Sequence, residues 1–412
     1  PLVWAGRATV LTDFERAILG SAGNPDRSIL ISGSRGIGKT VLLTELEDIA
    51  SRHGWIVLRA SAREQIAESL IQSAIPEAIN RLSPPQRRQI TGVSVAGIGS
   101  VRTEVESHDP APRLTTQLRE LISHLRSTGV LITIDEVQDA SPEDLTQVAV
   151  AYQDLVRDDL PVAVAMAGLT HGINTLLDLP GATFLRRARH YELGPLTLED
   201  AHAALADTAH DGGRLFSDAK RAAEFSKGYP YLVQLLGFLS WEAADELGVD
   251  NIDAHAVSAA IPRTLERLGV QVLQPALRDV PARQMEYLRA MAEIEDETRS
   301  SEIASSALAE ALGRPATSLS DIRARLIERD LITPAGWGLI EFAQPYLGQY
   351  LLDRGRPGVH LLGGGVDGVG VPAVAELVGP QDRAGQSLPQ GGGVGQGLLG
   401  ELHGGAVVDG AQ

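Results

Sequence analysis

The sequence contains no cysteine, which excludes structural disulfides and thiolate metal sites. No apolar run reaches the roughly eighteen residues that a membrane-spanning helix needs, and no secretory signal peptide is visible. The histidines show no spacing typical of a zinc site. These absences predict a cytoplasmic protein that has no contact with a membrane.

Basic residues are also in short supply, and Lys39, Lys220 and Lys227 are the only lysines. The formal net charge is −17 at pH 7, which disfavours non-specific binding to DNA because such binding depends on cations that neutralise phosphates. The length of 412 residues and the 43% hydrophobic content are sufficient for two or three domains, each with its own core.

Residues 33–40 match the phosphate-loop pattern G-x-x-x-x-G-K-[ST]. Its glycines allow successive backbone N–H groups to turn toward one phosphate, Lys39 adds a cation, and Thr40 offers a hydroxyl to Mg²⁺. An apolar run precedes the loop and a helical pattern follows it, which is the strand–loop–helix order of an anion site. The alternative is an ordinary glycine-rich turn before a helix. The residues expected to hold the phosphates are Gly33, Ser34, Arg35, Gly36, Ile37, Gly38, Lys39, Thr40 and Val41.

Apolar strand-like runs alternate with helical patterns over residues 27–195, which predicts an α/β fold with a parallel sheet flanked by helices. Near-continuous apolar character indicates that the strands are buried on both faces. Residues 91–106 alternate with a period of two and are predicted to form a β-hairpin insertion. The predicted strands are 28–32, 55–60, 130–135, 161–167 and 189–193.

Two carboxylates, Asp135 and Glu136, follow the apolar run that begins at Val130. The carboxyl ends of parallel strands form the edge at which α/β sheets bind ligands. We therefore expect Asp135 to bind Mg²⁺ together with Thr40, and Glu136 to act as the general base on the attacking water. Two polar residues at the start of a loop are the alternative without chemistry.

Together the two motifs resemble Walker A and Walker B, and the chain resembles the P-loop ATPases of the AAA+ superfamily and their STAND relatives. This resemblance implies ATP and Mg²⁺ as cofactors. Residues 4–16 are similar to the first segment of the origin-recognition-like branch, although Ala8 stands where an acidic residue is usual. The similarity implies that Gly6 and Arg7 lie beside the adenine.

Three further positions follow from the same resemblance. Thr170, after the fourth strand, corresponds to a residue that senses the γ-phosphate. Arg186 corresponds to an arginine finger supplied by self-association, with Arg187 and Arg189 as alternatives. Residues 228–230 resemble the G-x-P signature of STAND-type lids, which implies that Tyr229 and Pro230 close over the nucleotide.

The C-terminal half is predicted to be helical and to end in three helices, 281–292, 301–312 and 318–332, followed by a wing at 333–342. This order resembles a winged-helix domain. The residues that such a domain would turn toward a DNA groove are Arg314, Ser318, Ser320 and Arg323.

Charge does not favour that use, because residues 270–354 hold nine arginines and thirteen acidic residues, a net charge of −4. Eighteen of the 43 glycines fall after residue 354, where we expect disorder. The predicted organisation is an N-terminal segment on the adenine side (1–26), a P-loop ATPase core (27–195), a helical lid (196–270), a winged-helix-like domain (271–354) and a glycine-rich tail (355–412).

These features predict a Mg²⁺-dependent ATPase that converts ATP and water to ADP and phosphate slowly and acts as a nucleotide-driven conformational switch. One alternative is an ATP-dependent DNA-binding initiator or regulator that uses the winged helix. Another is a protein-interaction scaffold that binds nucleotide with little turnover. In either case we expect a protein partner of unknown identity.

Overall fold

The structure is a computed structural model that describes residues 6–21, 23–82, 113–125, 127–179 and 183–355. The predicted hairpin insertion and the glycine-rich tail lie outside these residues, except for Gly355. No helix in the described ranges is long and apolar enough to cross a membrane.

The first part of the chain is an α/β layer structure built around five strands. Every strand begins and ends within one residue of its predicted bounds. The strands are β1 (Ser28–Gly33), β2 (Ile56–Ser61), β3 (Val130–Asp135), β4 (Val162–Gly168) and β5 (Arg189–Leu193). The helices are α1 (Ala8–Leu19), α2 (Lys39–Arg52), α3 (Ile66–Ser69), α4 (Ile75–Leu82), α5 (Leu114–Ser123), α6 (Pro142–Arg157) and α7 (Thr170–Asp178).

The five strands form one parallel sheet in the order β2-β3-β4-β1-β5. Strand β1 therefore lies between β4 and β5, with Ser28 opposite Val164 and Ile29 opposite Arg189. Because all strands run in one direction, the phosphate loop after β1, the acidic pair at the end of β3 and the end of β4 meet at one edge. This arrangement confirms the predicted fold class.

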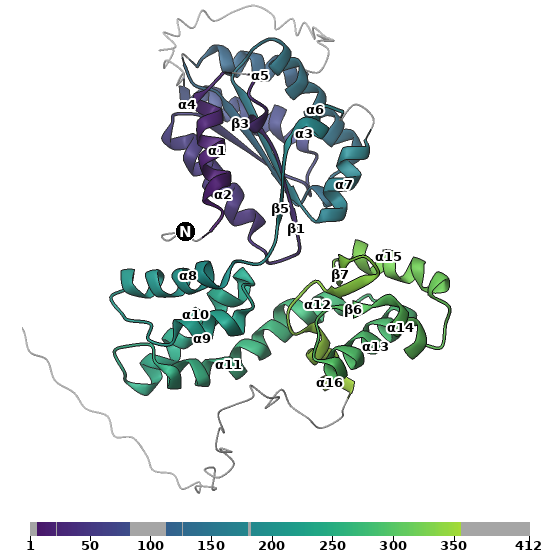
Figure 1. The fold of residues 1–412 in the computed structure, drawn as a ribbon. Helices are drawn as coiled ribbons and strands as arrows, with labels where there is room; N and C mark the ends of the chain where they lie inside the picture. Colours follow the sequence, from purple (N-terminus) through teal and green to yellow (C-terminus); the bar gives the residue numbers. More distant parts are fainter. Residues whose placement is uncertain (1–5, 22, 83–112, 126, 180–182, 356–412) are drawn as a thin grey trace, which may run out of the picture. The chain divides into compact units, whose positions relative to one another are not determined.

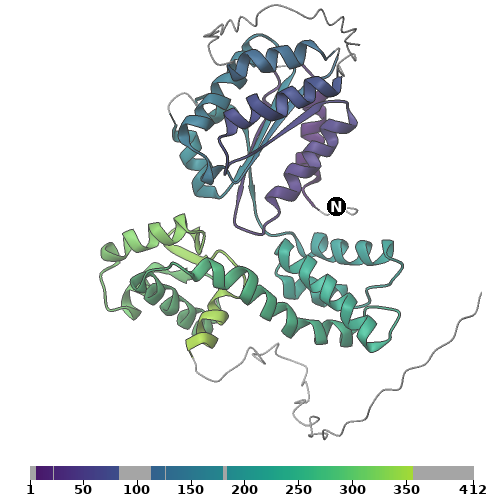
Figure 2. The same cartoon turned by 180° about the vertical axis from the view of Figure 1, so that it is seen from behind.

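Side-chain alternation explains why both faces of the sheet are covered (Figure 1 and, from behind, Figure 2). On one face, Ile29 and Ile31 pack in a buried cluster with Phe14 of α1 and Leu42 of α2. Leu30 points to the opposite face, where it joins a second cluster with residues of α3, α5, α6 and α7. Burial on both faces fixes the sheet and thereby the edge that carries the motifs.

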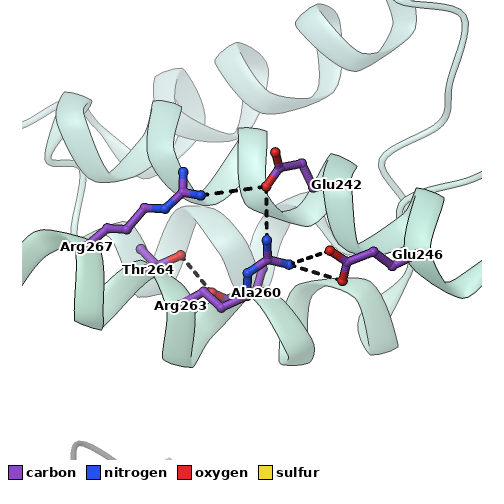
Figure 3. A network of polar contacts seen from close by, with 6 residues as sticks. All are labelled: Glu242, Glu246, Ala260, Arg263, Thr264 and Arg267. Carbon is purple, nitrogen blue, oxygen red and sulfur yellow. Dashed lines mark hydrogen bonds and ion pairs between the residues drawn. The ribbon is translucent and has the colours of Figure 1, made fainter. Parts of the chain in front are cut away.

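A helical lid follows the sheet and has a core of its own, rich in alanine. Between two of its helices, Arg263 of α11 donates two hydrogen bonds of 3.1 Å to Glu246 and one of 3.1 Å to Glu242, both on α10 (Figure 3). The lid helices are α8 (Leu198–Asp211), α9 (Ala219–Ser226), α10 (Pro230–Leu247) and α11 (Ala254–Leu268), and the short α12 (Gln274–Leu277) follows them.

The C-terminal part combines helices with a three-stranded antiparallel sheet of order β6-β8-β7, which agrees with the predicted winged helix. The predicted helices 301–312 and 318–332 are shorter in the structure than expected. Residues 303–304 pair with β8, and residues from 332 onward pair as β7, so both segments leave the helices. The elements are α13 (Ala282–Thr298), β6 (Ile303–Ala304), α14 (Ser305–Ala311), α15 (Ser320–Glu328), β7 (Ile332–Gly336), β8 (Leu339–Phe342) and α16 (Leu347–Gly355).

Candidate functional site

The phosphate loop connects β1 to α2 in the strand–loop–helix order that an anion site at a helix N-terminus requires. Gly36 and Gly38 have φ angles of 74° and 92°, which favour glycine. Lys39 is 6% exposed, and its Nζ donates to the carbonyls of Gly33 and Ser34, each at 3.0 Å. Burial lowers the pKa of Lys39, although nearby carboxylates act in the opposite direction.

The acidic pair meets the phosphate loop at the sheet edge. The Thr40 hydroxyl donates to Asp135 Oδ2 at 2.5 Å, and the Glu136 N–H donates to Asp135 Oδ1 at 2.9 Å. A hydroxyl and a carboxylate are hard oxygen donors that suit Mg²⁺, which binds few protein groups and keeps phosphate and water oxygens as its other ligands. Among the described residues, no cluster of three or more acidic or histidine side chains could hold a metal ion.

Gln138 joins this corner, although the sequence analysis did not single it out. It lies in the short turn Val137–Asp139 that follows the acidic pair. Its Nε2 donates to Glu136 Oε2 at 2.5 Å, and its Oε1 accepts the N–H of Leu169 at 3.0 Å. No sequence pattern predicts this bridge, because Leu169 is 31 residues away along the chain.

The N-terminal segment also reaches the phosphate loop. Arg7 donates to the carbonyl of Ile37 at 2.7 Å and to the carbonyl of Gly194 at 3.3 Å. Burial lowers the pKa of Arg7, and the charge of Asp200 opposes that shift. Arg7 lines a cavity of about 330 Å³ together with residues of β5 and of the segment that leads into α8, from His190 to Asp200.

Two contacts converge on Arg35 at the middle of the loop. Its carbonyl accepts a hydrogen bond from the hydroxyl of Tyr229, which precedes α10. Its N–H donates to Asp330 Oδ2 at 2.7 Å, and Asp330 is only 9% exposed. A Cβ atom at Gly36 would lie 2.2 Å from the Tyr229 hydroxyl oxygen, so the loop admits Tyr229 only because Gly36 has no side chain.

Asp330 was missed by the sequence analysis, which placed it inside a predicted helix. It follows α15 with a φ angle of 57°, and this left-handed conformation ends the helical segment. Burial raises its pKa to about 6, despite the opposing effect of the Arg35 N–H and of Lys39. An Arg-Asp-Leu run at a helix end carries no signal that distinguishes a buried carboxylate from an exposed one.

Other predicted residues make different contacts. Thr170 is the first residue of α7. It directly follows Leu169, whose N–H donates to Gln138. Arg186 lies in the turn Thr183–Arg187, donates to the carbonyl of Leu177 at 3.1 Å, and has a side chain 59% exposed. Among the residues that the structure describes, the contacts of Arg186 lead to α7 and not to the phosphate loop.

The residues expected to face DNA are engaged within the winged-helix module. Arg314 pairs with Glu286 at 3.1 Å, and Arg323 donates to the hydroxyl of Ser305 at 3.3 Å. The hydroxyl groups of Ser318 and Ser320 donate to carbonyls of the preceding turn. These contacts already occupy the polar groups that were expected to bind a DNA backbone.

Comparisons with known proteins agree with this arrangement. A family model described as an AAA ATPase domain matches residues 3–164, and a model described as a domain of unknown function matches residues 270–351. A comparison with curated proteins found no match.

Solved structures extend the likeness over most of the chain. The Walker-type ATPase PABY2304 of Pyrococcus abyssi is 17% identical with a TM-score of 0.58, covering 85% of this chain and 96% of its own. The ORC2 protein of Aeropyrum pernix is 17% identical with a TM-score of 0.53, covering 84% of this chain and 91% of its own. Residues 3–164 are therefore similar to an AAA ATPase domain, in a chain that has the fold of a P-loop ATPase with a helical lid and a winged-helix module.

Proposed function

We propose that this protein binds and hydrolyses Mg·ATP and uses the nucleotide site as a conformational switch. The observation that carries the switch is the position of Arg35. Its carbonyl bonds to Tyr229 at the start of lid helix α10, and its N–H bonds to Asp330 of the winged-helix module. One residue of the phosphate loop is thus held by two other parts of the chain, so a change at the loop alters the contacts of both.

ATP hydrolysis would use the two motifs at the sheet edge, the phosphate loop and the acidic pair. Loop amides donate hydrogen bonds to the phosphates and Lys39 offsets part of their charge, and Glu136 accepts a proton from the water that attacks the γ-phosphorus as ADP leaves. Thr40 and Asp135 are the residues that would hold Mg²⁺, which supplies charge neutralisation on the phosphate oxygens when bound. The likeness to ORC2, described as ADPNP and ADP complexes, supports an adenine nucleotide as the ligand.

The base of the nucleotide has a candidate pocket beside the loop. The cavity of about 330 Å³ includes Arg7, which contacts the loop through the carbonyl of Ile37. We assign the adenine to this cavity, with Gly6 and Arg7 on one side and the segment after β5 on the other. Pro230 lies near the loop too, since a Cβ atom built on Gly38 would lie 4.0 Å from the Pro230 Cβ.

The switch has an electrostatic basis. Asp330 places a carboxylate at a loop amide, and a nucleotide brings phosphate charges to the same loop. The Asp330 carboxylate and the nucleotide phosphates repel each other at the phosphate loop. ATP binding therefore favours a state in which Asp330 is protonated or displaced. A ligand shifts a conformational equilibrium only through such a difference in interaction energy between states.

Two further roles complete the proposal. Thr170, the first residue of α7, is the candidate sensor of the γ-phosphate. Arg186, exposed and held at α7, is the candidate arginine for a neighbouring subunit if ATP drives self-association. The STAND-like character of the lid rests on Tyr229 and Pro230, which lie at the start of α10.

The decisive experiment is a phosphate-release assay on the wild-type chain and on Glu136→Gln. We expect the variant to retain ATP while its turnover falls by at least ~100-fold, because the amide cannot accept the proton. The matched control is Glu143→Gln, at an exposed position of α6. Normal turnover in Glu136→Gln contradicts the assigned base, and absence of hydrolysis in the wild type contradicts the proposed activity.

A size measurement with and without ATP tests the role of Arg186. Assembly that requires ATP, together with lost turnover in Arg186→Ala, supports an arginine acting across an interface. A persistent monomer with normal turnover in that variant removes Arg186 from the mechanism.

A further inference from the structure

Gln138 bonds two parts of the core that are distant in sequence. Its Nε2 donates to Glu136 Oε2 at 2.5 Å, and its Oε1 accepts the Leu169 N–H at 3.0 Å. A carboxylate only accepts hydrogen bonds and a backbone N–H only donates, so the orientation of the amide is determined. A flipped amide would oppose both partners.

The surroundings of Gln138 form a slot that two glycines make possible. A Cβ atom at Gly168, at the end of β4, would lie 2.9 Å from Gln138 Oε1 and 2.6 Å from Val137 Cγ2. A Cβ atom at Gly172, in the first turn of α7, would lie 2.5 Å from the Cβ atom of Gln138. Neither glycine has a φ angle in the left-handed region, so close approach and not backbone conformation excludes a side chain there.

The conformation of Glu136 has to be held by hydrogen bonds to its neighbours. Its φ angle is 55°, a conformation that non-glycine residues rarely adopt. Its backbone is held by the hydrogen bond to Asp135 and by the Asp139 N–H, which donates to the Glu136 carbonyl at 2.8 Å. The Gln138 amide adds a hydrogen bond to the carboxylate itself, which restricts the direction in which Glu136 points.

We propose that Gln138 is a positioning residue that orients the Glu136 carboxylate and ties it to the end of β4. The inference rests on the proposed role of Glu136 as base. Because Gln138 also binds the N–H that precedes Thr170, a shift of the β4 end changes the position of Glu136. From Leu169, which precedes the candidate γ-phosphate sensor, the path to the base is therefore two hydrogen bonds long.

The test replaces Gln138 with Met, which has a similar length and keeps the slot filled but cannot make either hydrogen bond. Since the described contacts of Gln138 do not include the phosphate loop, we expect ATP affinity to change less than twofold. We expect kcat to fall ~10- to 100-fold, because misplacing a catalytic group by about 1 Å costs this much. Gln147→Met, at an exposed site on α6, is the matched control and should leave both quantities unchanged.

A second measurement separates positioning from general damage. In a Glu136→Gln background, Gln138→Met should cause no further loss of residual turnover, because the carboxylate that it orients is already gone. Equal loss of kcat and ATP affinity with a lower Tm would overturn the inference in favour of a structural role. Wild-type kcat in Gln138→Met, with Glu136→Gln inactive, would overturn this inference alone and leave the proposed ATPase intact.

Discussion

The phosphate loop and the acidic corner meet at one sheet edge but differ in what holds them. The loop is contacted by Arg7 from the N-terminal segment, by Tyr229 at the lid and by Asp330 of the winged-helix module. Among the described residues, the hydrogen-bond partners of the acidic corner, residues 135–138, all belong to the α/β core. The difference indicates a division of labour, in which the loop communicates with the lid and the winged-helix module and the acidic corner is held within the α/β core alone.

The largest effect should come from the loop itself. Lys39→Ala removes the cation that faces the phosphates, and we expect ATP affinity to fall by at least ~100-fold, equivalent to about 3 kcal/mol. Titration with a fluorescent ATP analogue measures this loss. Lys220→Ala, at an exposed lid lysine, is the control and should bind normally. Unchanged affinity in Lys39→Ala would mean that the loop does not hold the triphosphate.

Gly36→Ala tests the contact between loop and lid. The new Cβ would lie 2.2 Å from the Tyr229 hydroxyl oxygen at a backbone φ of 74°. We expect a loss of about 2–3 kcal/mol in the free energy of unfolding, from overpacking together with backbone strain. Gly213→Ala is the control, because its φ is 82° and nothing lies within 4 Å of its Cβ position.

A double variant sharpens this test. Tyr229→Phe removes the hydroxyl, so Gly36→Ala should cost less in that background than in the wild type, as denaturant unfolding can show. Additive losses would mean that the two side chains do not meet, and the loop would then lack the lid contact on which the comparison depends.

Asp330→Asn tests the winged-helix contact through pH. The carboxyl group has an unfolded pKa near 3.8 and a folded pKa of about 6, so the folded state binds the extra proton between these values. The free energy of unfolding therefore falls as the pH rises from about 4 to about 6, by ~2 kcal/mol for this group, and Asp330→Asn should abolish that slope. The charged groups around it are Lys39 and Arg35, which favour the anion, and Glu136, which opposes it.

The same substitution should affect binding. At pH 7.5 the uncharged amide introduced by Asp330→Asn would no longer repel the phosphates, so ATP affinity should rise severalfold. Asp321→Asn, on an exposed face of α15, is the control for both experiments. A wild-type pH slope and affinity in Asp330→Asn would remove the winged-helix module from the switch.

The sequence was sufficient for the parts of the fold that local pattern determines. The strand ending at Asp135 and the loop ending at Thr40 were predicted because apolar runs and fixed motif spacing are local signals. That these two residues contact each other follows from the parallel sheet. Gln138 and Asp330 were not predicted, because the bonds that define them join residues 31 and 295 positions apart. Such contacts depend on packing that no local period encodes.

The smallest effect should come from the exposed ion pairs between α10 and α11. Arg263 bonds Glu246 and Glu242 across α10 and α11 (Figure 3), but the three side chains are 36% to 64% exposed. Exposed ion pairs contribute little, so Arg263→Ala should lower the free energy of unfolding by about 0.5–1 kcal/mol, less at high salt.

ATP affinity in Arg263→Ala should stay within twofold of the wild type, because Tyr229 contacts the loop from the opposite end of α10, beyond the helix turns that carry Glu242 and Glu246. Arg267→Ala provides the comparison, since its guanidinium lies 4.0 Å from Glu242 and should matter less still. A clear loss of ATP affinity in either variant would show that the loop responds to the whole lid, and the communicating region would then extend well beyond Arg35 and its two partners.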